Sequence, residues 1–327
     1  MSRLSRRSFA ASVAAAAMAR PALGQGAYPT RPVTMVIPFA AGGPTDTVGR
    51  LIAQAMSADL GQPVVVENVG GAGGTLGAQR VANARPDGYS ILLHHIGMAT
   101  IPTLYRRLSY DAINGFETLG LVTEVPMTLV ARRNIEATNL QELVALIRQR
   151  GEALNYANAG IGAASHLCGL LLMKAVDTRM TTVPYRGTGP AMNDLVAGTV
   201  DLMCDQTTNT TEQIRAGTIR GFAVTTPERV SALPDMPTAA QGGLPGFEVS
   251  VWHGLYAPRG TPAPITERLN RALVAALQDA TIARRFADLG TAPVPVARAT
   301  PQLHRDFWQA DIAKWRPLIQ AAGQFAD

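Results

Sequence analysis

Residues 33–59 read VTMVIPFAAGGPTDTVGRLIAQAMSAD, which is a buried strand followed by a loop of small residues and an amphipathic helix. The apolar run predicts a strand over residues 33–39, and apolar residues at helical spacing predict a helix over residues 45–59. Because strands that alternate with helices form mostly parallel sheets, this stretch indicates an α/β fold. The pattern then repeats, with further elements expected over residues 64–67 (strand), 74–84 (helix) and 90–94 (strand).

A second block with the same rhythm begins after Leu119. Its expected strands cover residues 127–131, 154–157, 182–184, 200–204 and 220–225, and its expected helices cover residues 140–150, 163–176, 190–198 and 211–216. A Pro/Gly-rich connection over residues 234–246 leads to a strand over 251–257 and to helices over 265–278 and 301–321.

Two similar blocks and a C-terminal segment predict two lobes, the first of them discontinuous. Lobe 1 is expected to comprise residues 27–125 and 252–327, and lobe 2 residues 126–251. The chain then crosses between the lobes near residues 123–130 and 248–253. Two crossings form a hinge, and hinge closure around a ligand is an established type of domain motion.

The composition narrows the class of protein. The chain has 327 residues, enough for two domains, and only 6% of them are aromatic. Its formal charge of +5 comes mostly from Arg3, Arg6, Arg7 and Arg20, because the first 26 residues include no Asp or Glu. Without these arginines the net charge is +1, and no basic stripe remains. A nucleic-acid partner is therefore not expected.

Residues 1–26 have the layout of a cleaved export signal. A basic start precedes an Ala-rich stretch over residues 9–18, and SRRSF at residues 5–9 fits the twin-arginine pattern. A disordered basic tail on a cytosolic protein is the alternative. We expect cleavage between Gly24 and Ala27 and a periplasmic mature protein, because no later segment has the ~18 continuous apolar residues that span a membrane.

The chain has two cysteines, Cys168 and Cys204. A lone pair in an oxidising compartment is a natural disulfide candidate, and a disulfide is the favoured prediction. Two buried thiols that pack as small apolar side chains are the alternative. The Cα separation that decides between them is not available from sequence.

The loop PFAAGGPTD at residues 38–46 joins the first expected strand to the first helix. Its small residues let backbone amides approach a ligand, and the free N–H groups and positive dipole end of the helix point at the loop. This arrangement suits an anion, although Thr45 or Asp46 could simply cap the helix. If close backbone approach matters, a β-branched residue at Gly42 should weaken binding more than folding.

Similar polar loops follow strands in the second block: GIGAASH at residues 160–166, PYRGTGP at 184–190 and CDQTT at 204–208. Ligands of open α/β sheets bind outside the carboxyl ends of the strands. Ser165 and His166 could bind carboxylate oxygens there, although a capped or core histidine is the commoner role for His166. We expect loops from both blocks to converge on one cleft.

The sequence carries no signature of a nucleotide, metal or hydrolytic site. The segment ENVGGAGGTLG at residues 67–77 does not match the dinucleotide-binding motif G-x-G-x-x-G, because its last glycine comes one position late. His94 and His95 are adjacent on a strand and so face opposite sides, which makes them a poor metal pair. Asp46 and Asp205 could pair across a cleft, but Asp205 could equally bind a ligand ammonium or cap the following turn. No metal, cofactor or catalytic residue is expected.

The chain resembles the Bug family, the substrate-binding components of tripartite tricarboxylate transporters, over essentially its whole mature length. The resemblance implies a type II periplasmic binding protein fold, with two doubly wound lobes joined by a two-strand hinge, and no catalysis. It rests on the order and spacing of YP at 28–29 with RPV at 31–33, PFAAGG at 38–43 with Asp46, EN at 67–68 with GAGG at 71–74, PDGY at 86–89, SHL at 165–167, VPYRG at 183–187, PDMPT at 234–238 and WHGLYAP at 252–258.

The resemblance also implies a ligand site. Family members hold a ligand carboxylate through backbone amides of the first loop, with ordered waters assisting. The pair His94-His95 departs from the small hydroxyl-bearing residues expected at that point, which predicts a pocket reshaped by imidazoles. With the loop residues described above, the predicted ligand-binding set is Phe39, Ala41, Gly42, Gly43, Asp46, His95, Ser165, His166, Tyr185, Gly187, Thr188 and Asp205.

The expected function is therefore capture of a small organic acid by a monomeric periplasmic protein, without a cofactor, and its delivery to membrane transporter subunits. The family binds dicarboxylates, tricarboxylates, amino acids and aromatic acids. One rival is an exported enzyme that uses Ser165 and His166, but residues adjacent on a helix make a poor nucleophile–base pair. The other rival is a binding protein that serves a sensor.

Overall fold

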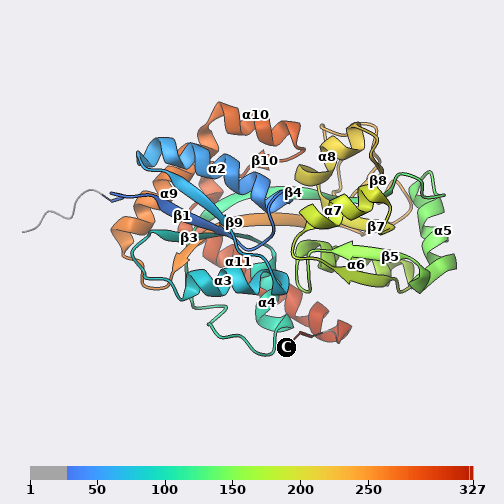
Figure 1. The fold of residues 1–327 in the computed structure, drawn as a ribbon, viewed down its shortest axis with the longest axis horizontal. Helices are drawn as coiled ribbons and strands as arrows, with labels where there is room; N and C mark the ends of the chain where they lie inside the picture. Colours follow the sequence, from blue (N-terminus) through green and yellow to red (C-terminus); the bar gives the residue numbers. More distant parts are fainter. Residues whose placement is uncertain (1–27, 324, 327) are drawn as a thin grey trace, which may run out of the picture.

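The computed structural model describes residues 28–323 and 325–326, and the predicted export signal over residues 1–26 lies outside them. Two groups of helices and strands lie side by side in Figure 1. The strands are β1 (Val33–Ile37), β2 (Val64–Asn68), β3 (Ser90–His95), β4 (Phe116–Arg132), β5 (Asn155–Asn158), β6 (Thr181–Pro184), β7 (Leu202–Gln206), β8 (Ile219–Val224), β9 (Ser250–Pro258) and β10 (Ala292–Pro293). The α-helices are α2 (Pro44–Leu60), α3 (Thr75–Ala82), α4 (Gly97–Leu104), α5 (Leu140–Arg150), α6 (Ala164–Val176), α7 (Thr188–Ala197), α8 (Thr207–Arg215), α9 (Ala263–Gln278), α10 (Ala280–Asp288) and α11 (Pro301–Ala322).

One sheet runs through both groups, in the strand order β2-β1-β3-β9-β4-β7-β5-β6, with β8 and β10 also paired to β4. Within the first group β1 is parallel to β2 and β3, and within the second β5 is parallel to β6 and β7. These parallel pairs are the ones that the alternation of strands and helices predicted. The strand β9 is antiparallel to both β3 and β4.

The long strand β4 connects the two groups, as Figure 1 shows. It has 17 residues. Its first part pairs with β9 up to Pro126, and its last part pairs with β7 and β8 from Met127 onward. The sequence predicted a strand only over residues 127–131, so the first part of β4 was missed. The predicted lobe boundaries at residues 125 and 252 fall beside this change of partners, and the division into lobes remains our proposal.

Helix α2 shows why the first unit folds as it does. Its residues Val48, Ile52 and Met56 recur at helical spacing and are all buried. Each fully buried side chain of this size contributes ~1.5–3 kcal/mol relative to an exposed one. The helix begins at Pro44, where a missing N–H costs nothing, and ends at Gly61 in the left-handed conformation. The predicted bounds differ from these by a single residue at each end.

The prediction was wrong for several helices. Helices α4 and α10 were not predicted, because α4 is apolar on all sides and α10 follows α9 after a single residue, Asp279. Helix α7 starts at Thr188 rather than at residue 190, and α8 starts at Thr207 rather than at residue 211. The two earlier starts place helix N-termini at the carboxyl ends of the strands that precede them.

A disulfide joins Cys168 on α6 to Cys204 on β7, with their Cα atoms 6.1 Å apart. Both side chains are fully buried. Within the described residues, no helix is long and apolar enough to cross a membrane. The same residues contain no cluster of three His, Cys, Asp or Glu side chains arranged to hold a metal ion.

Candidate ligand-binding site

A small enclosed cavity lies where strand-end loops of the two groups meet. Its volume is about 10 Å³, roughly the space of one water molecule. The residues that line it follow β1, β3, β5 and β7, so they come from both halves of the sheet, as predicted for a cleft at the carboxyl ends of parallel strands. They are Phe39, Gly43, Pro44, Thr45, His95, Ala159, Ala164, Ser165, Thr188, Asp205 and Gln206.

Four helices begin at this cavity, namely α2, α6, α7 and α8. None of the four has a side-chain cap on its first turn. Among the other helices, Asn139, Asp279 and Thr300 cap α5, α10 and α11, whereas α3, α4 and α9 also lack a side-chain cap. The uncapped N–H groups and the positive dipole ends of four helices therefore point at one small volume, which is an arrangement that binds anions.

The neutral imidazole of His95 forms part of the cavity wall, and the neutral imidazole of His253 lies next to it. The ring of His95 stacks on Phe39 at a centroid distance of 4.5 Å, and His253 lies 6.0 Å away on the paired strand. Burial lowers the pKa of His95 to about 3 and holds the pKa of His253 well below its usual value. Nδ1 of His95 accepts the N–H of Gly97 at 2.9 Å, which assigns its proton to Nε2. His95 thus supplies an uncharged N–H donor beside the helix N-termini.

Asp205 is the one carboxyl among the residues that line the cavity. It is buried, and its Oδ2 accepts a hydrogen bond from Nδ2 of Asn209 at 2.6 Å. Burial raises the pKa of Asp205 to about 6, although hydrogen bonds from Asn209, Gln206 and Thr188 offset part of the rise. The cavity therefore has one carboxyl group among many hydrogen-bond donors.

Ser165 and His166 have different roles in the structure. Ser165 lines the cavity, and its Oγ accepts the N–H of Ala159 at 2.9 Å, so its own proton is free to be donated. Nδ1 of His166 accepts the N–H of Gly162 at 3.3 Å, and His166 does not line the cavity. Within the described part of the chain, no hydrogen bond joins Ser165 to a histidine, so the pair lacks the contact that a nucleophile and its base need.

Several other predicted residues lie beside the cavity rather than in its wall. Asp46 accepts hydrogen bonds from the Gly42 amide at 3.0 Å, from Arg50 and from Asn68, so it braces the first loop. The hydroxyl of Tyr185 donates to Asp194 at 2.6 Å. The residues of the predicted set that do not line the cavity are Ala41, Gly42, Asp46, His166, Tyr185 and Gly187.

The sequence predicted that a β-branched residue at Gly42 would prevent close approach of the backbone to a ligand. The structure does not support this reason. A Cβ atom on Gly42 would meet nothing within 4 Å, although the residue has a φ of +79°. A side chain there would strain the backbone but would not block a close approach. One tight position without a positive φ is Gly189 on α7, where a Cβ atom would lie 2.7 Å from the carbonyl oxygen of Ala41.

The two halves are in direct contact around the cavity. The Ala40 amide donates to the Arg186 carbonyl at 2.9 Å. The hydroxyls of Tyr105 and Thr100 donate to the carbonyls of Ile161 and Gly162 at 2.9 and 3.0 Å. These bonds join segments that the sequence assigned to different lobes, so those segments are in direct contact in this structure.

Sequence reasoning missed part of the cavity wall. It did not single out Ala159, Ala164 or Gln206, which are strand-end or first-turn residues of loops that were otherwise recognised. It also missed His253, which reaches the site through the pairing of β3 with β9, where His95 lies opposite His253. That pairing joins residues far apart in the chain, and no local pattern signals it.

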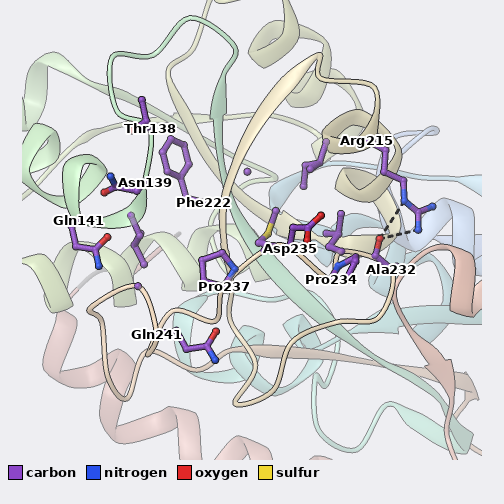
Figure 2. Close-up of a pocket in the computed structure, with 16 residues that line it drawn as sticks. Thr138, Asn139, Gln141, Arg215, Phe222, Ala232, Pro234, Asp235, Pro237 and Gln241 are labelled. Carbon is purple, nitrogen blue, oxygen red and sulfur yellow. Dashed lines mark hydrogen bonds between the residues drawn. The ribbon is translucent and has the colours of Figure 1, made fainter.

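A larger cavity lies elsewhere, between α5, α8 and the segment after β8 (Figure 2), with a volume of about 580 Å³. Several of its polar side chains already have partners. The guanidinium of Arg215 donates to the Ala232 carbonyl, Asn139 caps α5, and Gln241 accepts from Arg229. Because these groups do not converge on a common point, the smaller cavity between the halves is the better candidate site.

Comparisons with known proteins give a consistent result. A family model described as the tripartite tricarboxylate transporter family receptor matches residues 48–324. An Agrobacterium vitis protein, called the UPF0065 protein in the TAR-I ttuE-ttuC' intergenic region, is 52% identical over 93% of this chain and 88% of its own length.

Solved structures agree with this match. The periplasmic binding protein BugD is 48% identical, with a TM-score of 0.89 over 92% of this chain and all of the other. MatC from Rhodopseudomonas palustris, with bound malate, is 42% identical, with a TM-score of 0.85 over 89% and 100% of the two chains. An R. palustris protein with adipate, Rpa4515, is 34% identical, with a TM-score of 0.85 over 90% and 98%. The predicted periplasmic binding protein fold and family are thereby confirmed.

Proposed function

Because the chain belongs to the tripartite tricarboxylate transporter receptor family of periplasmic binding proteins, we propose that it captures a small organic carboxylate between two lobes and delivers it to a tripartite-type membrane transporter. The observation that carries this proposal is the convergence of four uncapped helix N-termini on one enclosed cavity. A carboxylate is the ligand group that such a set of N–H donors fits best.

The residues of the cavity divide into two roles in this proposal. The amides of Gly43 and Thr45 and the first turn of α6 hold the carboxylate, and the Ser165 hydroxyl and the Nε2–H of His95 add two neutral donors. Asp205 faces the part of the ligand that carries no negative charge, because two unpaired carboxylates in contact repel each other. The support for this arrangement is the burial and hydrogen bonding of the described side chains.

The ligand enters when the lobes separate. A cavity of about 10 Å³ is far smaller than the ~300–1,000 Å³ of typical ligand pockets, so binding requires an open form. Lobe 1 (residues 27–125 and 252–327) and lobe 2 (residues 126–251) would rotate about β4 and β9. The protein acts as a monomer in the periplasm. Residues 1–26 are the signal for its export to that compartment.

Small dicarboxylates are the first ligands to test, since relatives with 42% and 34% identity were solved with malate and with adipate. An enzyme that uses the same cleft is disfavoured by the missing contact between Ser165 and a histidine. A binding protein that serves a sensor would use the same closing lobes, and binding data alone would not separate it from a transport protein.

We expect a panel of di- and tricarboxylates, amino acids and aromatic acids to contain at least one ligand that raises the melting temperature of the mature protein. At ten times its Kd, that ligand should add about 1.4 kcal/mol to the free energy of unfolding, because it binds the folded state only. Differential scanning fluorimetry and calorimetric titration measure this, with the ligand analysed for turnover afterwards. A panel without any stabilising acid, or a product in the tubes, would contradict the proposal.

A further inference from the structure

A second groove, which we call the rear groove, lies behind the hinge strands. Adjacent residues of a strand point to opposite faces of a sheet, and on β9 His253 and Trp252 do so. Nε2 of His253 lies 3.4 Å from Oγ1 of Thr45 at the cavity, whereas the indole N–H of Trp252 donates to Oδ2 of Asp311 on α11 at 2.8 Å. The rear groove is on the Trp252 side and has a volume of about 400 Å³, enough for a small ligand.

Aromatic rings and carboxyl groups line the rear groove. The rings are those of Trp252, Phe307 and Trp315, and the carboxyl groups are those of Glu124, Glu248 and Asp311. This combination is typical of sites for organic cations, because the negative face of an aromatic ring and a carboxylate both attract positive charge.

Asp311 gives the rear groove a built acceptor. Its side chain is only 8% exposed, and its Oδ1 accepts no hydrogen bond from the described residues. Burial raises the pKa of Asp311, an effect that the indole of Trp252, the Lys314 ammonium and the indole of Trp315 partly offset. A carboxyl held in this way, with one oxygen bonded and one not, lacks a donor that a bound cation would supply.

The rings at the edges of the groove already attract cations of the same chain. The guanidinium of Arg298 lies 5.7 Å from the centre of the Phe307 ring and pairs with Glu124 at 2.6 Å. The ammonium of Lys314 lies 5.8 Å from the centre of the Trp315 ring. Glu248 is exposed and forms no ion pair within residues 28–323. Beside these contacts, the carboxyl of Asp311 is left for a ligand, whereas the ring of Trp252 is only 3% exposed and packs against His304 and Phe307.

We propose that the rear groove binds a small organic cation with N–H donors, an alkylammonium or guanidinium compound. The walls come from both sides of the hinge, since Thr225, Pro227 and Glu248 line the groove together with residues of α11.

Butylammonium chloride is a suitable probe, with butanol as its neutral counterpart and ionic strength held constant. Two of the three tryptophans of the chain line the rear groove, so intrinsic fluorescence reports on its occupation. We expect a saturable change with butylammonium that butanol does not produce. The Asp311→Asn variant keeps an acceptor for Trp252 and should lose at least tenfold in apparent affinity. The Lys314→Gln variant removes a competing cation and should gain affinity.

The outcomes separate the two proposals. An equal response to butanol, or an unchanged response in Asp311→Asn, would overturn the rear-groove site. A stronger response to a lysine-containing tripeptide than to butylammonium would assign the groove to a basic side chain of a partner protein and would overturn the small-cation proposal. A normal butylammonium response in a protein that binds no carboxylate would count against the proposed function alone.

Discussion

The Gly189→Ala variant should bind its carboxylate about 5- to 150-fold more weakly than the parent protein while folding at least as stably. Gly189 is in the first turn of α7, and a Cβ atom there would lie 2.7 Å from the Ala41 oxygen and 3.2 Å from the Gly43 nitrogen of the facing loop. Both contacts are with backbone atoms, which cannot rotate away. Overpacking of this kind costs ~1–3 kcal/mol, which corresponds to a loss of about 5- to 150-fold in affinity.

The substitution should not destabilise the open form, because the Ala41 loop moves away when the lobes separate. Alanine is also a better helix former than glycine by ~0.8–1.0 kcal/mol. Calorimetric titration and urea unfolding of the ligand-free protein measure the two effects separately. The matched control is Asn193→Ala on the exposed side of α7, which should favour the helix and leave affinity unchanged. A parallel loss of stability and affinity in Gly189→Ala would show that α7 packs against the first loop even without ligand.

Acid should destabilise the protein steeply, because all five histidines of the chain are buried and neutral. Burial lowers the pKa of His95 and His304 to about 3 and that of His166 to about 4, and it holds the pKa of His94 and of His253 well below the usual value. In the unfolded chain each histidine has its ordinary pKa of ~6.5. Each therefore stabilises the fold above pH ~6.5, and this contribution is lost as the pH falls from ~6.5 towards the folded-state value.

The size of this effect follows from the protons taken up on unfolding. Each histidine contributes up to ~1.4 kcal/mol per pH unit. Asp205, with a pKa raised to about 6, and Asp311, whose pKa is also raised, act in the opposite direction because they bind protons more readily in the folded state. A net uptake of about three protons near pH 5 predicts a loss of about 4 kcal/mol between pH 5.5 and pH 4.5.

Urea unfolding at pH 7, 6, 5 and 4.5 tests this expectation. His304 is the informative single position, because it is fully buried, both of its ring nitrogens lack a partner, and it does not line the cavity. The free energy of unfolding of the His304→Leu variant should depend less on pH, because unfolding then takes up about one proton fewer. A stability that stays flat down to pH 5 would mean that the buried imidazoles bind protons without unfolding.

Much of the fold could be predicted from local pattern. Helix α2 was predicted to within one residue at each end from its apolar spacing, whereas β1 ends at Ile37, two residues before the predicted end at residue 39. Helix α4 could not be found in this way, since a helix that is buried on all sides has no polar face to reveal its period. The continuity of β4 was hidden by Pro126, whose backbone is accommodated where the strand changes partners.

The candidate site could likewise be predicted only in part from local pattern. Loops of small residues ahead of helices indicated where the chain offers free amides, and Phe39, Gly43, Ser165 and Thr188 do line the cavity. Sequence could not show that Asp46 turns back to the amide of Gly42, because a carboxyl that braces a loop and one that meets a ligand look alike in sequence. It also could not place His253 beside His95, since that contact depends on pairing between distant strands.

The bond between Cys168 and Cys204 bears on how the protein has to be made. Both sulfur atoms belong to side chains with no exposed surface, in the core of the half that carries Ser165 and Asp205. No oxidant reaches such positions once the chain has packed, so the two thiols must meet before the core is complete. Protein recovered from a reducing cytoplasm would then retain both thiols during later exposure to air, and a thiol count on the unfolded chain would distinguish the two preparations.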